Sequence, residues 1–373
     1  MNGRDPWNAL ITLLEEPLRG VPEGPLAGRT LVVKDLIDTA GIRTTYGSRV
    51  YADHVPERHA TVVQRALDAG AAIVGKANLF EFAWGVIGTN EWYGTVHNPV
   101  RPGLTTGGSS SGNAAAIAAG LCDLGIGTDT GCSVRLPAAA CELVGLKPRL
   151  GTIPTDGVFP LCPSFDTVGP LARTVGEAAV LWSVLAGRPV PEPRLDGLRI
   201  GLLRAAPNLA DGRETEASDA AEGWVERLEG LGARVVETAI PGPPADTWPV
   251  FLHEAARSHA ETFPGRADEY GSAMRAKLAA AQRVEPAAVT EGYRSLLAWR
   301  QLVPEVDLYV SPCVAIEWPP EEVDELDVRL PLSSFLRWVN LLGWAGLAIG
   351  NMQLVAPREE TVLAAGLAWE RDS

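Results

Sequence analysis

The residues best suited to covalent chemistry lie in two serine-containing blocks near the middle of the chain. One block reads GGSSSG from Gly107, and the other reads GTDTGCSVRLP from Gly127. A serine hydroxyl that loses its proton to a nearby base can attack an amide carbonyl. Both blocks belong to the stretch 105–151, in which Gly, Ala, Ser and Thr predominate. Such composition permits close backbone approach and tight turns, so the structural alternative is a glycine-rich connection between buried helices.

A base for such a serine has to come from elsewhere in the chain. The five histidines all lie outside the two blocks, and only four of the 32 basic residues are lysine. In a chain that otherwise uses Arg, each Lys is a candidate position at which an amine has to give up its proton. Lys34 and Lys76 both follow short apolar runs and are the two candidates. A surface ion pair with Asp35 is the alternative role for Lys34.

A neutral lysine has to be buried and has to lack a carboxylate partner. Lowering a lysine pKa from about 10.4 to about 7–8 costs roughly 4 kcal/mol, which desolvation can supply.

Three familiar motifs are excluded by single residues. A phosphate-binding loop needs Lys where Asn113 stands, and a dinucleotide fingerprint needs Gly where Thr130 stands. The G-x-S-x-G nucleophile elbow needs Gly at the position of Arg135. The ordinary nucleotide-binding and α/β-hydrolase interpretations are therefore set aside.

Several blocks in a fixed order resemble the amidase signature family. The similarity is dense from about residue 25 to 185, and 307–315 and 332–370 resemble the family's C-terminal part. The matching blocks are LVVKDLIDTAG, KANLFEFAWG, GGSSSG, GTDTGCSVRLPAA, GLKPRLG and SFDTVGPLARTV.

This resemblance implies a role for each matching residue. Ser133 corresponds to the acylated nucleophile, Ser109 to a relay serine on a cis peptide bond, and Lys34 to the base. The two serines are 24 residues apart, as in the family. Backbone N–H groups of the turn at the nucleophile would form the oxyanion hole, from Thr130, Gly131, Cys132 and Ser133.

The resemblance also suggests residues around the substrate. Trp84 and Gly85 align with a segment that borders the acyl pocket, although Trp84 also fits a plain core position. Arg135 is expected to pair internally with Asp129, and the alternative is that it binds a substrate carboxylate. No metal and no cofactor is implied.

Two features depart from the family pattern. Cys132 precedes the nucleophile where the family usually has Gly, which restricts the backbone of the oxyanion turn. Near the C-terminus the chain passes from Ile349 through Gly350-Asn351 directly to Met352, where relatives usually carry a longer insertion.

The elements that position these residues follow α/β patterning. An apolar run at 30–33, a helical pattern at 60–69 stopped by Gly70, and a run at 71–74 predict a strand–helix–strand unit. We expect a single α/β/α domain spanning 1–373, with a mixed, largely parallel central sheet. Ser110 and Ser111 are expected to cap a helix starting near Asn113. Further expectations are strands at 198–203 and 308–310, an amphipathic helix over 217–231, loops at 187–197 and 240–250, and helix over 264–300.

Composition limits the partners. A formal net charge of −14 disfavours nucleic acid and anionic membrane surfaces. The most apolar stretch, 339–356, is interrupted by Asn and Gln and fits a core segment. The N-terminus lacks a secretory pattern, and five scattered cysteines without a CxxC pair indicate a reduced cytoplasmic protein without disulfides. The expected partners are a small amide substrate and a second copy of the chain.

The leading functional hypothesis is an amidohydrolase that cleaves a small carboxamide, or a related carbamoyl or urea-type amide, through an acyl-enzyme on Ser133. One alternative is an amidotransferase subunit that releases ammonia from glutamine. The other, suggested by Cys132, is a catalytically impaired binding module on the same fold.

Overall fold

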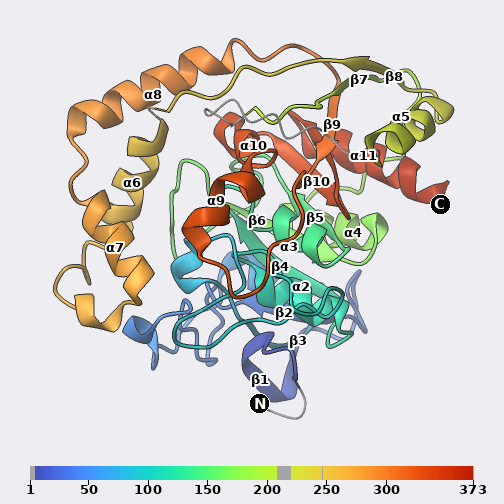
Figure 1. Ribbon diagram of the computed structural model, residues 1–373. Coiled ribbons are helices and arrows are strands. Elements are labelled where there is room, and N and C mark those ends of the chain that lie inside the picture. The colour runs from blue at the N-terminus through green and yellow to red at the C-terminus, as the bar shows by residue number, and fades with distance from the viewer. Residues whose placement is uncertain (1–4, 208–219, 246, 373) are drawn as a thin grey trace.

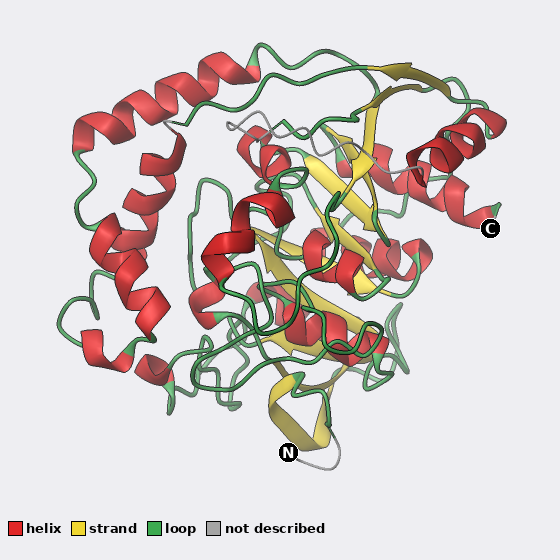
Figure 2. Ribbon diagram, in the orientation of Figure 1, coloured by secondary structure: helices red, strands yellow, loops and turns green. Residues whose placement is uncertain are grey.

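A computed structural model describes residues 5–207, 220–245 and 247–372. These residues form one eleven-stranded sheet with helices on both of its faces (Figures 1 and 2). The strand order is β1-β3-β2-β4-β6-β5-β10-β11-β9-β7-β8. The strands are β1 (Leu10–Arg19), β2 (Thr30–Lys34), β3 (Ala72–Ala77), β4 (Leu124–Asp129), β5 (Val144–Lys147), β6 (Thr167–Ala172), β7 (Arg199–Leu202), β8 (Arg234–Glu237), β9 (Leu308–Pro312), β10 (Ala345–Ile349) and β11 (Met352–Ala356).

Helices connect most of these strands. The α-helices are α1 (Thr61–Asp68), α2 (Ser111–Ala118), α3 (Arg135–Ala140), α4 (Val175–Ala186), α5 (Ala220–Gly230), α6 (Thr247–Ser258), α7 (Ser272–Ala281), α8 (Pro286–Arg300), α9 (Glu325–Ser333), α10 (Arg337–Leu342) and α11 (Glu359–Arg371). Short 3-10 helices lie at Arg49–Tyr51, Glu81–Ala83 and Ala267–Glu269.

The mixed α/β architecture is confirmed, but the parallel share of the sheet was overestimated. Only four of the ten neighbouring strand pairs are parallel, in the blocks β3-β2-β4 and β9-β7-β8. The predicted strand–helix–strand unit is one of them, because β2 and β3 are parallel and α1 joins them. Every pair from β4 across to β9 is antiparallel, and apolar runs in the sequence do not reveal the direction in which two strands pair.

Two apolar layers hold the helices against the sheet. One layer packs α1, α4, α5 and α11 against one face, and the other packs α2 and α3 against the opposite face. Alternation along β2 sends Leu31 and Val33 into the first layer and Val32 into the second. Lys34, two residues after Val32, therefore emerges on the side of α2 and the serine blocks.

Three helices lie apart from the sheet. Figure 1 shows α6, α7 and α8 together on its left side, joined by long segments to β8 and β9 on the right. The expected loop over 240–250 is only partly correct, because α6 already begins at Thr247. Pro249 lies in the first turn of α6, where a missing N–H leaves no hydrogen bond unmade. Position 217 of the predicted amphipathic helix lies outside the described residues.

The C-terminal departure from the family pattern takes the form of a tight hairpin. β10 and β11 pair antiparallel, with Ile349 opposite Met352 and Gly350 at a φ of 53° in the turn. The five cysteines are all buried free thiols. No helix in the described part of the chain has the length and apolar character needed to cross a bilayer.

Candidate active site

Lys34 at the end of β2 is the centre of the site. Its side chain is fully buried, and Nζ lies 2.7 Å from Ser109 Oγ and 2.9 Å from Thr128 Oγ1. Burial lowers the pKa of Lys34 to about 7, and the nearby charges of Asp129 and Asp166 only partly oppose this effect. The amine therefore reaches its neutral form near physiological pH, as a general base requires.

The alternative role for Lys34 as a surface ion pair with Asp35 is wrong. Asp35 is buried and accepts hydrogen bonds from the backbone and hydroxyl of Thr45 at 2.8 and 2.6 Å. The cation nearest to it is Lys76, at 3.6 Å. Lys76 also donates to the Ile37 carbonyl and Thr44 Oγ1, both at 2.6 Å. Lys76 is thus occupied by a carboxylate and a carbonyl, and Lys34 is not.

Close packing of the first serine block against β4 holds Ser109 in place. The Gly108-Ser109 peptide bond is cis. A Cβ at Gly127 would lie 2.8 Å from Ser110 Oγ, so this approach requires glycine. Ser110 does occupy the N-cap position of α2, but the expected capping bond is absent. Its hydroxyl instead contacts the backbone of Thr128 on β4, which joins the two serine blocks.

Ser133 lies at the start of the turn that leads into α3. The backbone N–H of Ser110 donates to the Ser133 carbonyl at 3.2 Å, so the two blocks are adjacent. The Ser133 side chain lines a cavity and is otherwise covered, with 6% of its surface exposed. Lys34 and Ser109 are joined by a hydrogen bond, whereas no bond between Ser109 and Ser133 occurs among the described residues.

The oxyanion turn offers unused donors. The backbone N–H groups of Gly131, Cys132 and Ser133 donate to no acceptor within the described ranges. These residues and Thr130 line the same cavity. The Thr130 hydroxyl donates to Asp166 at 2.6 Å and ties the turn to the segment before β6. Unpaired N–H groups in a turn that lines a cavity can stabilise a developing oxyanion.

Cys132 fits this turn without replacing the nucleophile. The residue is 2% exposed, and its thiol lies 4.0 Å from the Gly108 carbonyl, on the side of the glycine loop. Burial, assisted by Asp129, raises the pKa of the Cys132 thiol to about 12. The sulfur is consequently protonated at neutral pH, and a protonated thiol is a poor nucleophile.

Arg135 pairs internally with Asp129, as expected, and the alternative that it binds a substrate carboxylate finds no free donor. It is fully buried and pairs with Asp129 through Nε and Nη2, both at 3.0 Å. Its other donors reach the Leu336 carbonyl, Gln353 and Asn340 at 2.9, 2.7 and 2.6 Å. With every donor occupied by protein, Arg135 fixes the turn between β4 and α3.

The cavity beside Ser133 has a volume of about 660 Å³. Trp84 and Gly85 line it, in agreement with their expected position, and a Cβ at Gly85 would lie 2.4 Å from the Phe80 ring. Most of the remaining lining was not predicted, because it comes from two distant segments of the chain. Its apolar members are Pro243, Pro244, Trp248, Phe251, Leu326, Leu330 and Leu341, together with Leu161 and Phe165.

Three charged side chains also line this cavity. Arg329 donates to both carboxylate oxygens of Glu325 through Nε and Nη2, at 2.8 and 2.5 Å. Arg337 lies at the start of α10, with its guanidinium carbon 4.9 Å from the centre of the Trp248 ring. The sequence offered no local motif for any of the three.

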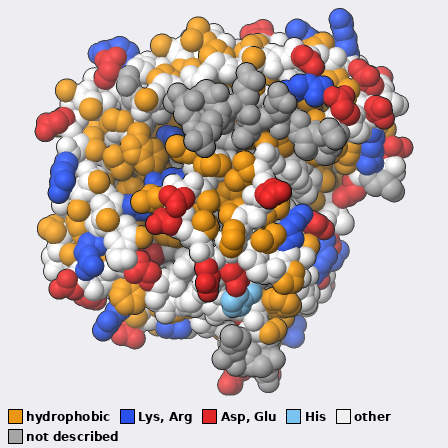
Figure 3. Space-filling view, viewed as in Figure 1, with side chains coloured by type: hydrophobic (Ala, Val, Ile, Leu, Met, Phe, Trp, Pro, Cys, Tyr) orange, Lys and Arg blue, Asp and Glu red, His pale blue; other side chains and the backbone are white. Residues whose placement is uncertain are grey.

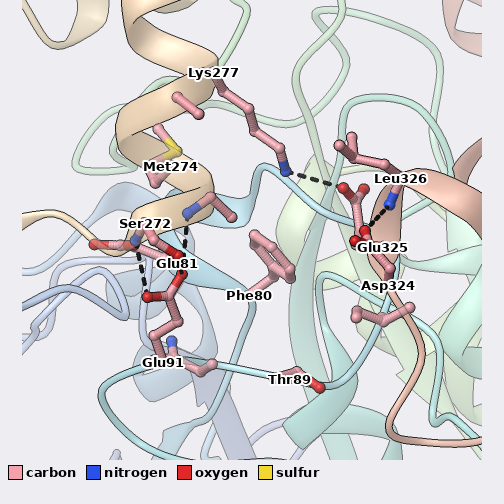
Figure 4. A pocket seen from close by; sticks show the side chains of 14 residues that line it. Phe80, Glu81, Thr89, Glu91, Ser272, Met274, Lys277, Asp324, Glu325 and Leu326 are labelled. Atoms are coloured by element: carbon pink, nitrogen blue, oxygen red, sulfur yellow. Dashed lines mark hydrogen bonds and ion pairs between the residues drawn. The ribbon is translucent and has the colours of Figure 1, made fainter.

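A second cavity of about 390 Å³ adjoins the first, and Glu325 and Leu326 line both. Figure 4 shows Lys277 of α7 pointing toward Glu325, at an Nζ–Oε2 distance of 3.1 Å. Lys277 also donates to the carbonyl of Trp84, which lines the first cavity, at 2.6 Å.

On the face in Figure 3, acidic and basic side chains alternate around the edge and hydrophobic side chains gather toward the middle.

A family model described as Amidase matches residues 13–357. The chain belongs to the amidase family. It is thus an enzyme of a family that acts on carbon–nitrogen bonds. A solved amidase structure superposes with a TM-score of 0.82 at 30% identity, over 94% of this chain and 85% of that one.

Curated sequences similar to this chain include components of amidotransferases. A glutamyl-tRNA(Gln) amidotransferase subunit from Natronomonas pharaonis is 43% identical over 252 residues, which are 63% of this chain and 58% of that protein. The corresponding subunit from Halobacterium salinarum is 33% identical, over 98% of this chain and 99% of its own length. The chain thus spans less than two thirds of the first of these relatives.

Proposed function

We propose that this amidase hydrolyses a small carboxamide, or a related carbamoyl or urea-type amide, through an acyl-enzyme on Ser133. The hydrogen bond of 2.7 Å between buried Lys34 and Ser109, beside a cavity lined by Ser133, carries the proposal. A lysine whose pKa burial lowers to about 7 can accept a proton at neutral pH.

The residues divide the chemistry as follows. Ser133 Oγ attacks the amide carbonyl and passes its proton to Ser109, while the Ser109 proton moves to Lys34. The N–H groups of the turn stabilise the oxyanion of the tetrahedral intermediate. Return of the proton through Ser109 to the leaving nitrogen breaks the C–N bond and leaves an ester on Ser133. A water molecule, deprotonated along the same relay, then releases the carboxylic acid and restores Ser133.

The relay needs a Ser109–Ser133 hydrogen bond in the substrate complex. Catalytic hydrogen bonds are often long in unliganded enzymes and shorten when substrate binds.

An amidotransferase subunit is the second candidate. Its support is the identity to glutamyl-tRNA(Gln) amidotransferase subunits, which extends over nearly the whole chain in the Halobacterium salinarum protein. Both candidates use the same acyl-enzyme, and they differ in substrate and in the fate of the ammonia.

Ammonia release from a panel of carboxamides that includes glutamine tests the proposal. We expect turnover of several simple amides by the isolated chain and none by Ser133→Ala. Turnover of glutamine alone, and only with an added partner subunit, would favour the amidotransferase. Absence of turnover for every amide would favour the binding module.

A further inference from the structure

Arg337 is the first residue of α10 and lines the cavity beside Ser133. Its guanidinium lies over the Trp248 ring, and Trp248 stacks on Phe251 with ring centres 5.0 Å apart and an interplanar angle of 5°. Phe251 in turn meets Trp84 edge-on at 5.3 Å. A row of three aromatic rings therefore runs from Arg337 to the segment that borders the acyl pocket.

Arg337 differs from the other arginines near this site in having no anionic partner. Arg135 pairs with Asp129, and Arg329 pairs with Glu325. In the described part of the chain, Arg337 makes no side-chain hydrogen bond or ion pair, and its contact is the ring of Trp248. An aromatic face attracts the cation but offers no lone pair, so the N–H donors remain available.

Arg337 is nevertheless charged in the free protein. Burial lowers its pKa to about 10, which leaves the guanidinium protonated at neutral pH. Arg337 and Ser133 line the same cavity, so the cation acts within the space that would hold a substrate. Burying an unpaired cation in an apolar wall costs free energy, and a bound anion offsets that cost.

We propose that Arg337 binds the carboxylate of an amide substrate that carries one negative charge away from the scissile bond. This inference rests on the proposed amidase function and specifies the class of its substrate. A guanidinium presents two parallel N–H donors that match a carboxylate. Arg337 supplies one guanidinium with free donors, which matches one carboxylate. The apolar lining suits a short hydrocarbon linker between the carboxylate and the amide.

Matched substrate pairs test the role of Arg337 in turnover. The monoamides of dicarboxylic acids with three to six carbons are each compared with the neutral amide in which methyl replaces the carboxylate, such as succinamate with butyramide. We expect wild type to prefer the anionic member. Arg337→Gln should lower kcat/KM for that member by about 10- to 150-fold, the value of a hydrogen bond to a charged group, and so reduce the preference. Arg337→Lys should restore part of it.

Exposed Arg294, which pairs with Glu291, provides the control. Arg294→Gln should leave the preference for the anionic amide unchanged. An equal kcat/KM for both members of every pair in wild type would overturn the proposal, as would a preference that survives in Arg337→Gln.

A binding measurement separates this proposal from the proposed function. In Ser133→Ala, calorimetric titration should show tighter binding of the best anionic monoamide than of its neutral analogue, and Arg337→Gln in that background should remove the difference. Equal binding of the two amides to Ser133→Ala would refute the anion site even in an active amidase. Selective binding without any turnover by wild type would support the anion site and reject the hydrolase.

Discussion

Replacing Lys34 with methionine should stabilise the fold near neutral pH while it removes activity. Lys34 is fully buried, and burial lowers its pKa from 10.5 to about 7. That difference corresponds to a destabilisation of roughly 5 kcal/mol when the amine is protonated in the folded state. Methionine fills a similar volume without this cost, but it loses the two hydrogen bonds to Ser109 and Thr128, worth about 1 kcal/mol each. The net gain expected near pH 7 is therefore roughly 2–3 kcal/mol.

The stability difference between Lys34→Met and wild type should change with pH in a defined direction. Because the folded pKa of Lys34 is below the unfolded value, unfolding takes up a proton between about pH 7 and pH 10.5, and wild-type stability rises with pH across that window. Lys34→Met has no amine to take up this proton, so its gain in stability over wild type should be largest at pH 7 and below. It should then shrink by about 1.4 kcal/mol for each pH unit above 7.

Urea denaturation of both proteins at pH 7 and pH 9 measures this change, and an amide assay follows activity. Lys76→Met is the matched control, because it also removes a fully buried lysine but leaves Asp35 without its cation. It should lose stability instead. A Lys34→Met protein that is less stable than wild type at pH 7, with a difference independent of pH, would refute the reasoning.

Three further predictions follow from the site. Ser109→Ala should lower kcat by about 10²–10⁴-fold with little effect on the thermal midpoint, since it removes the bridge for the proton; unchanged kcat would exclude the relay. The wild-type kcat/KM should rise with pH and level off above about pH 7, as the amine of Lys34 loses its proton; a pH–rate profile that falls through this range would contradict a lysine base. Arg135→Met should destabilise the fold by about 3–5 kcal/mol in urea denaturation, because Asp129 would be left buried and unpaired. A loss below 1 kcal/mol would show that the pair does not hold the turn.

The sequence identified the parts of the site that lie in compact motifs. Lys34, Ser109 and Ser133 stand in blocks whose order along the chain is informative, and the bond between Lys34 and Ser109 agrees with their expected roles. Thr128, the second partner of Lys34, lies inside one of those blocks, between Gly127 and Asp129, but no spacing rule pointed to its hydroxyl.

The far wall of the cavity could not be predicted. Trp248 and Arg337 come from segments more than 100 residues beyond the serine blocks, and only the tertiary fold brings them to Ser133. Local patterns were also misleading in two places. The proline-rich composition before α6 concealed a helix start at Thr247, because proline is tolerated in a first turn. Serine commonly caps helices, and Ser110 stands at the N-cap of α2. Its hydroxyl nevertheless hydrogen-bonds to the backbone of Thr128 on β4.

Labelling with a serine-reactive fluorophosphonate tests the central claim most directly, because it reports the nucleophile without knowledge of the natural substrate. Peptide mass spectrometry should place a single adduct on Ser133 in wild type and in Cys132→Ala, and no adduct should form in Ser133→Ala. Labelling should slow in Lys34→Met, since the hydroxyl would then lack its base. An adduct on Cys132, or labelling that persists in Ser133→Ala, would contradict a serine amidase.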